Sequence, residues 1–406
     1  MSPRDPGPAG RPEAGGETAR VPAHEVAVWR KLKARRAPLE VEFELTARCN
    51  NHCRHCYVDL PAGDPKARAA ELSAEEIVEL AGEAASMGAV WCLLTGGEPL
   101  LRDDFAQVYL ALKRLGLLLG VFTNACLVTP EHVELFRRYP PRDLEVTVYG
   151  ATRATYERVT RRRGSFEAFR RGLGLLLDGG VPVRLKAMAL RSNVHELAQL
   201  RSFCREHTKD TCRIDPILHL RYDGDEARNA EICAERLSPE EVVVVERADE
   251  ERFGRLEQGC REGVLVLPER REQHADACDH LFQCGAGDGS FSIGYDGTFR
   301  VCGALRRPDA QVGVRPGAPG AVSLREAWER VVPRVRDLRA ADPEYLSRCR
   351  VCPIINLCLW CPAHALLETG CLDAPVEFFC AVAHARATAL TGGAADPRQG
   401  AAGSCR

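Results

Sequence analysis

The stretch VEFELTARCNNHCRHCY (41–57) joins an apolar segment to three closely spaced cysteines. Residues 41–46 are typical of a buried β-strand, and the cysteines follow that strand directly. A second apolar segment, AVWCLLT (89–95), runs into the glycine-rich turn TGGEPLL (95–101). Both stretches therefore place reactive or flexible residues just after a predicted strand, where parallel α/β proteins carry their functional loops.

Apolar segments continue along the chain and alternate with stretches of helical periodicity. A capping box at Ser73–Glu76 and a proline after Thr129 mark two of the helix starts. The alternation predicts an α/β fold, a partial (β/α)6 TIM-like barrel, because six strand–helix units fall short of a complete barrel. The six predicted strands are 41–46, 89–95, 117–124, 143–149, 181–190 and 212–220.

The pattern changes after residue 275 to short strands, glycine turns and cysteine pairs. The segment 291–302 predicts a hairpin that turns at Asp296-Gly297. We expect metal ligands, more than an apolar core, to hold this region together. The predicted organisation is a disordered tail (1–22), a leading helix (23–40), the barrel core (41–245), a linker (246–275), the cysteine-rich domain (276–385) and a second disordered tail (386–406).

The charge composition is balanced, with 55 Lys and Arg against 57 Asp and Glu. This balance argues against a general nucleic-acid binder, which carries a basic excess. The sequence has no apolar run long enough to cross a membrane, and its first residues lack the apolar core of a signal peptide. We therefore expect a cytoplasmic protein without nucleic-acid or membrane partners.

Nineteen cysteines in a chain of this kind point to metal or cluster ligation, since a disulfide framework needs an oxidising compartment. Three cysteines lie within 49–56 and nine within 278–380. Zinc is an open alternative for both groups. His52 or His55 could complete a tetrahedral site with the first three thiolates, and C-x2-C pairs like those of the second group occur in zinc ribbons.

The C-x3-C-x2-C spacing of Cys49, Cys53 and Cys56, followed by an aromatic residue, resembles the radical S-adenosylmethionine (SAM) superfamily. The resemblance implies that these cysteines bind a catalytic 4Fe–4S cluster with one iron left open. It also implies that the GGE stretch holds the methionine amino group of SAM, with glycines that allow close approach and a carboxylate for the ammonium. The implied SAM-binding residues are Tyr57, Gly96, Gly97, Glu98, Thr147, Arg161 and Asn193.

The second cysteine group is similar to the SPASM domain, a C-terminal extension that carries two auxiliary 4Fe–4S clusters in many radical SAM enzymes. This chain has one residue fewer than the SPASM pattern between Cys358 and Cys361, which leaves the ligation by Cys361 open. Cys371 is an alternative for the last ligand. The resemblance implies Cys278, Cys284, Cys302 and Cys361 for the first auxiliary cluster, and Cys349, Cys352, Cys358 and Cys380 for the second.

These resemblances imply an enzyme that reductively cleaves SAM to a 5′-deoxyadenosyl radical, which abstracts hydrogen from a substrate. The expected substrate is a ribosomally made peptide or a protein side chain, and a separate peptide-recognition protein could assist. A tetrapyrrole or another small molecule is the alternative, and a non-enzymatic iron–sulfur or zinc protein is a third hypothesis. A low-potential electron donor of the ferredoxin or flavodoxin type is the implied partner. The sequence identifies no catalytic acid or base, and His219, in an apolar segment, is expected to be a core residue.

Overall fold

The computed structural model describes residues 36–208, 212–259, 280–282 and 284–391. The predicted tail 1–22 and most of the leading helix 23–40 lie outside these residues. At the end of that predicted helix, residues 37–39 have no regular structure and Glu40 already begins the first strand.

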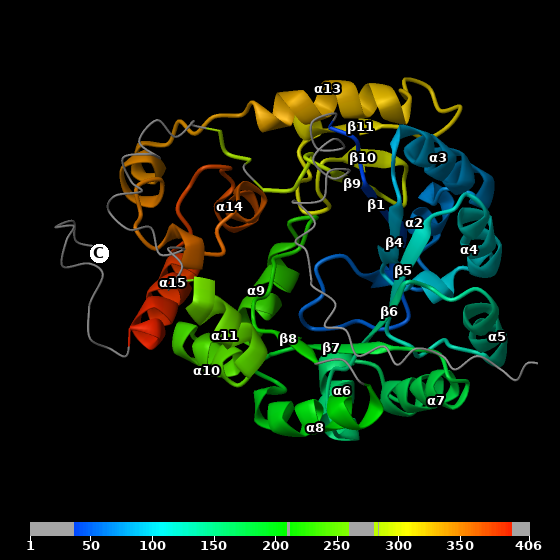
Figure 1. Ribbon diagram of the computed structural model, residues 1–406, viewed down its shortest axis with the longest axis horizontal. Coiled ribbons are helices and arrows are strands. Elements are labelled where there is room, and N and C mark those ends of the chain that lie inside the picture. Colours follow the sequence, from blue (N-terminus) through cyan, green and yellow to red (C-terminus); the bar gives the residue numbers. More distant parts are fainter. Residues whose placement is uncertain (1–35, 209–211, 260–279, 283, 392–406) are drawn as a thin grey trace, which may run out of the picture. The chain divides into compact units, whose positions relative to one another are not determined.

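The described strands form one large sheet with the order β11-β10-β9-β1-β4-β5-β6-β7-β8 and a small β2-β3 pair (Figure 1). All six predicted strands are present, and each pairs in parallel with the next in chain order, which confirms the partial barrel. The last two are shorter than predicted. The strands are β1 (Glu40–Thr46), β4 (Trp91–Gly96), β5 (Leu118–Thr123), β6 (Asp143–Thr147), β7 (Arg184–Met188) and β8 (Arg213–Asp215), with β2 (Arg48–Cys49) and β3 (Leu60–Pro61) beside them.

The predicted helices follow their strands, and the capping box at Ser73 and Glu76 forms as expected. The arginine-rich stretch after β6 contains a helix, α6, and two consecutive helices, α10 and α11, follow α9. The helices here are α2 (Pro65–Ala70), α3 (Ala74–Met87), α4 (Phe105–Arg114), α5 (Pro130–Arg138), α6 (Arg153–Thr160), α7 (Ser165–Asp178), α8 (Leu197–His207), α9 (Glu226–Glu235), α10 (Pro239–Arg247) and α11 (Glu250–Gly259).

The barrel core lies between the sheet and these helices. Phe43, Leu94 and Val121 on neighbouring strands are fully buried, as is Ile77 on the apolar side of α3. Burial of each such side chain stabilises the fold by about 1.5–3 kcal/mol relative to exposure. The strand ends are thereby held firmly, which fixes the positions of the loops that follow them.

The cysteine-rich region extends the same sheet at the edge of β1. Strand β9 (Ser290–Ile293) runs parallel to β1, with Phe43 opposite Ile293. The predicted hairpin is confirmed, since β10 (Thr298–Arg300) returns antiparallel to β9 and Gly297 has the positive φ that the turn requires. Strand β11 (Gln311–Gly313) completes this edge.

The cysteine-rich region also has an apolar core, contrary to the expectation that ligands would largely replace one. Trp328 and Val332 of α13 (Leu324–Arg336) and Phe379 of α15 (Glu377–Leu390) are buried. Helix α15 runs five residues into the predicted tail 386–406, because Arg386 forms a buried ion pair with Glu246 of α10 at 2.9 Å. The third helix of this region is α14 (Pro362–Thr369). In the described part of the chain, no helix has the length and apolarity needed to cross a membrane.

Candidate active site

A cavity of about 490 Å³ lies at the carboxyl ends of the parallel strands. The first cysteine group enters it from the loop after β1, and the glycine-rich turn enters from the end of β4. The two stretches that the sequence singled out therefore meet, as their positions after consecutive strands predicted. The polar and charged lining residues include Asn51, Asp59, Thr95, Asn124, Thr147, Lys186, Arg213, Asp215, His219, Arg252 and His364.

Cys49, Cys53 and Cys56 all line this cavity and are all free thiols. Burial raises the pKa of the Cys56 thiol to about 12, and the nearby Asp59 carboxylate adds to that effect. Burial also raises the pKa values of Cys49 and Cys53, and each is raised further by another thiol of the group. Three close thiols, of which Cys53 is buried and Cys49 and Cys56 are partly buried, resist ionisation unless a cationic centre compensates them, so this donor set fits a metal cluster.

Among the described residues, no three Cys, His, Asp or Glu side chains converge closely enough to hold a single metal ion. A zinc ion would need such convergence, since it gathers its ligands around one point. An iron–sulfur cubane does not, because each thiolate bonds a different iron atom of the cluster. The lack of such a group among the described residues therefore does not count against a cluster.

The two glycines of the TGGEP turn allow backbone to pack on backbone. A Cβ on Gly96 would lie 2.1 Å from the Thr46 carbonyl oxygen, and one on Gly97 would lie 2.2 Å from that of Arg48. The Gly97 N–H donates to the Thr46 carbonyl at 2.6 Å. The turn is thus locked against the start of the cysteine loop, and both glycines line the cavity as the sequence predicted.

Glu98 occupies a different place from the one expected. Its side chain is fully buried and does not line the cavity. The carboxylate accepts hydrogen bonds from the Leu100 N–H at 3.1 Å, the Thr123 hydroxyl at 2.8 Å and the Asn124 N–H at 2.8 Å. In this structure the carboxylate positions the backbone around it, and a direct contact with the SAM ammonium stays a prediction.

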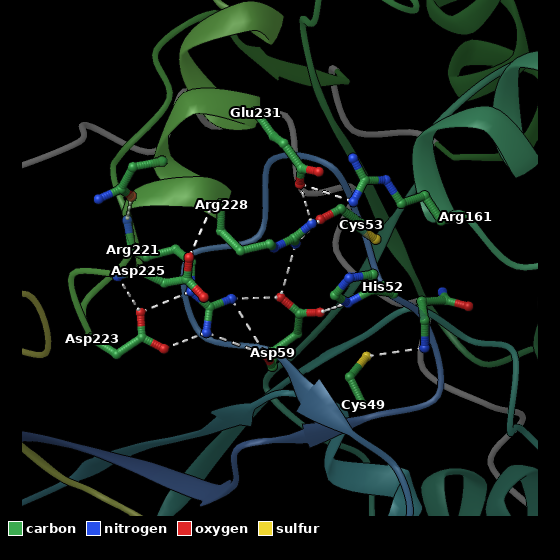
Figure 2. A network of polar contacts seen from close by, with 12 residues as sticks. Cys49, His52, Cys53, Asp59, Arg161, Arg221, Asp223, Asp225, Arg228 and Glu231 are labelled. Carbon is green, nitrogen blue, oxygen red and sulfur yellow. Dashed lines mark hydrogen bonds and ion pairs between the residues drawn. The ribbon is translucent and has the colours of Figure 1, made fainter.

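The other predicted SAM contacts divide in two. Thr147 and Tyr57 line the cavity, and the Tyr57 ring packs on Tyr222 with 4.6 Å between centroids. Arg161 instead donates to Glu231 at 2.9 Å, as Figure 2 shows, and Asn193 is fully buried. The Asn193 amide hydrogen-bonds to the surrounding backbone. It donates to the carbonyls of Tyr149 and Met188 and accepts from the Leu190 N–H. Neither Arg161 nor Asn193 lines the cavity.

Sequence reasoning missed several cavity residues. Asn124 follows β5 and points its amide toward the cysteine loop, where Nδ2 donates to Asn50 Oδ1 at 2.8 Å. Its place after a strand was the available signal. His219 was expected in the core, but it lines the cavity and stacks on His364 with 4.0 Å between ring centroids. Burial, followed by the neighbouring His364, lowers the pKa of His219 to about 3, so this imidazole is neutral at pH 7.

The later cysteines form two groups in the described residues. The pKa of Cys361 is raised to about 11 by burial and further by Cys302 and Cys284, which places these three thiols near one another. Cys278, the remaining predicted ligand of that site, lies outside the described residues. The placement of Cys361 favours the ligand role that the shortened spacing had left open.

The second group is more complete. A small separate cavity is lined by the four cysteines that were predicted for the second auxiliary cluster, Cys349, Cys352, Cys358 and Cys380. Burial raises the pKa of Cys349 to about 12, and its three partners raise it further. Cys371 is exposed and lines neither cavity, so the arrangement favours Cys380 as the last ligand.

Comparisons with known proteins agree with this geometry. Residues 43–204 match the family model of the Radical SAM superfamily. The chain is 26% identical over 355 residues to the AdoMet-dependent heme synthase of Methanosarcina barkeri. This alignment covers 82% of this chain and 94% of that protein. It is 23% identical over 254 residues to the PqqA peptide cyclase of Rhizobium meliloti, covering 58% and 66% of the two chains.

The fold is also similar to solved structures. The structure of Streptococcus suis SuiB bound to precursor peptide SuiA superposes with a TM-score of 0.61 at 15% identity. That match covers 85% of this chain and 76% of SuiB. The likeness in fold therefore extends over most of this chain.

Proposed function

Because this chain is a radical SAM superfamily enzyme, which uses a 4Fe–4S cluster and SAM, we propose that Cys49, Cys53 and Cys56 hold that cluster. When bound, the cluster supplies one electron to SAM and so yields methionine and a 5′-deoxyadenosyl radical that takes a hydrogen atom from the substrate. The backbone of Gly96 and Gly97 shapes the adjoining wall, and Thr147 and Asn124 offer it hydrogen-bonding groups.

Two auxiliary 4Fe–4S clusters are part of the proposal, with residues 41–245 as the radical SAM core and 276–385 as the SPASM domain. The separate four-cysteine cavity supports the second auxiliary site, and the grouping of Cys284, Cys302 and Cys361 supports the first. Leu359 and His364 of the cysteine-rich region line the main cavity. The auxiliary sites therefore belong to a region that contributes directly to the substrate chamber.

For the substrate we propose a tetrapyrrole that carries carboxylate side chains. The observation that carries this choice is the charge of the cavity wall, where Lys186, Arg213 and Arg252 outnumber two acidic residues. Asp215 is shared by both arginines, at 2.8 Å from Arg213 and 3.1 Å from Arg252. Lys186 is already paired with Glu145 at 3.0 Å. The cationic capacity for a carboxylate from outside therefore comes from the two arginines that share Asp215.

Part of the wall is apolar, which suits a tetrapyrrole ring. It contains Phe122, Met188, Ile217, Leu218 and Leu359. The AdoMet-dependent heme synthase aligns over 94% of its own length with this chain, a wider match than that of the peptide cyclase. This difference in coverage also favours the tetrapyrrole class.

Binding of iron coproporphyrin III, which carries four carboxylates, tests the choice. We expect the anaerobic holoprotein to bind it with a shift of its visible absorption band, and Arg213→Met to weaken binding roughly 10- to 150-fold, the scale of one charge-assisted hydrogen bond. The matched control is Arg184→Met on the neighbouring strand β7, since Arg184 pairs with Asp143 and does not line the cavity. No binding, or equal losses in both variants, would reject the tetrapyrrole.

A peptide substrate is the second candidate. It is favoured by the likeness to SuiB, whose structure contains a precursor peptide, and by the relative named PqqA peptide cyclase. The test is anaerobic incubation with SAM, reductant and any short cysteine- or aromatic-rich peptide encoded beside the gene, followed by mass spectrometry. A peptide that loses hydrogen while iron coproporphyrin III is ignored would replace the first candidate with the second.

A further inference from the structure

We propose that Asp59 and Arg228 form a charge-compensated pair that sets the reduction potential of the first cluster. We treat both as positioning residues, because Asp59 contacts His52 and Arg228 contacts the Cys53 carbonyl of the cysteine loop. The inference rests on the proposed assignment of Cys49, Cys53 and Cys56 as ligands of that cluster.

Asp59 lies three residues after Cys56 and is almost fully buried, with 4% of its surface exposed. One carboxylate oxygen lies 2.6 Å from Nδ1 of His52, which stands within the cysteine loop itself. The other oxygen accepts from Arg221 Nη1 at 3.0 Å and from Arg228 Nη2 at 3.3 Å. Figure 2 shows this carboxylate between the cysteine loop on one side and the two guanidinium groups on the other.

Arg228 reaches the same loop from helix α9. Its Nη2 donates to the Cys53 carbonyl at 2.8 Å, and its Nη1 donates to Glu231 at 2.6 Å. Arg221 is held in turn by Asp223, which is half exposed and does not line the cavity. The network therefore connects the cysteine loop, the segment after β8 and α9 through buried charges (Figure 2).

A buried carboxylate beside a cluster that must accept an electron opposes that reduction. A buried guanidinium favours it, because it stabilises the added negative charge. Neither charge could stay alone at this depth without a large desolvation cost, which explains why they occur as a hydrogen-bonded set. The two charges thus act in opposite directions on the same potential, and the sign of each change can be predicted.

The experiment measures the midpoint potential of the cluster whose electron paramagnetic resonance signal changes when SAM is added, in the full-length holoprotein. We expect Asp59→Asn to shift this potential upward and Arg228→Gln to shift it downward, with the double variant between the two. The matched control is Asp223→Asn, which alters a partner of Arg221 away from the cysteine loop and should leave the potential unchanged. Shifts of the same sign in both test variants, or no shift in either, would overturn the proposal.

A substitution could also prevent cluster loading, and a second pair of variants covers that outcome. Arg228→Lys keeps the positive charge but loses the paired N–H donors of the guanidinium. The cluster's midpoint potential in Arg228→Lys should therefore lie closer to that of wild type than the potential in Arg228→Gln does. Arg221→Lys and Arg221→Gln form an equivalent pair, and equal potentials within both pairs would overturn the inference. Failure of the ligand assignment looks different: the SAM-responsive signal would then persist after Cys49, Cys53 and Cys56 are all changed to Ala.

Discussion

The Glu98 carboxylate accepts a hydrogen bond from the Thr123 hydroxyl at 2.8 Å, which joins the turn after β4 to the end of β5. The same carboxylate receives the N–H groups of Leu100 and Asn124. The Glu98 side chain is fully buried. It therefore fixes the turn after β4 relative to the loop after β5 from the protein interior, and both segments line the cavity. We therefore expect its influence on SAM to be indirect, through the positions of Gly97 and Asn124.

The first prediction separates this role from a direct contact. Glu98→Ala removes an acceptor from three buried donors, so we expect a loss of about 2–3 kcal/mol in the free energy of unfolding, measured by anaerobic urea titration. Glu98→Gln keeps the shape and should bind SAM within about threefold of wild type. If Glu98→Gln weakens SAM binding roughly 10- to 150-fold while it keeps its stability, the carboxylate contacts the ammonium after all.

The second prediction concerns pH. Burial raises the pKa of Glu98 to about 7 from its ordinary 4.5, against the opposing hydrogen bonds of Asn124, Thr123 and Leu100. Because the folded-state pKa is the higher one, the proton's contribution to stability is fully present below 4.5 and is lost as pH rises through about 7. Wild type should therefore lose stability relative to Glu98→Gln between these values, by on the order of 3 kcal/mol over the whole window. Urea titrations of both proteins from pH 4.5 to 8 measure this difference, and a constant difference would contradict it.

The third prediction concerns metal content. Anaerobic reconstitution should give about twelve iron atoms per chain, from three 4Fe–4S clusters. Changing Cys49, Cys53 and Cys56 together to Ala should remove about four of them and abolish the SAM-dependent change in the spectrum. Cys371→Ala, an exposed cysteine outside both cavities, is the control and should retain all the iron. Zinc in place of iron after anaerobic purification would contradict the cluster assignment.

The fourth prediction follows from the ion pair between Arg161 and Glu231, whose N–O distance is 2.9 Å. Arg161→Ala should leave the SAM dissociation constant within about twofold of wild type, because this side chain does not line the cavity. Asn124→Ala, which alters a lining residue, should raise that constant. Equilibrium dialysis with labelled SAM compares the two, and the reverse order would restore the SAM contact that the sequence suggested for Arg161.

The sequence predicted the six barrel strands because each is an apolar run bounded by clear helix and turn signals. It also predicted that the cysteine loop and the TGGEP turn would meet, since both follow neighbouring parallel strands. It could not show the direction of a side chain. Glu98 and Asn193 stand next to the site in sequence, yet both turn into the protein to satisfy buried N–H and C=O groups.

Long-range pairing was the other limit of the sequence. The parallel contact of β9 with β1 joins residues 250 positions apart, for example Phe43 and Ile293, and no local pattern encodes it. The same holds for Asp59 and Arg228, which meet only because α9 folds back on the cysteine loop. His219 was assigned to the core from its apolar neighbours, which line the same cavity wall.

The last prediction concerns the second auxiliary site. Arg348 donates to the Cys380 sulfur at 3.4 Å and also pairs with Glu377, so a cation is fixed beside this four-cysteine cavity. Such a contact favours the reduced state of a cluster, as expected for a site that accepts an electron from the substrate radical.

A Cys349→Ala/Cys352→Ala variant should therefore still cleave SAM to 5′-deoxyadenosine but fail to complete the product, because the substrate radical has no electron acceptor. Chromatography of a single reaction measures the amount of 5′-deoxyadenosine and the amount of final product. The apolar core around Trp328 and Phe379 should keep this region folded without the cluster, and retained SAM binding is the control. A folded variant with full product yield would assign the cluster a structural role. Loss of SAM cleavage while the first cluster remains intact would instead indicate that the second auxiliary cluster delivers electrons to the first.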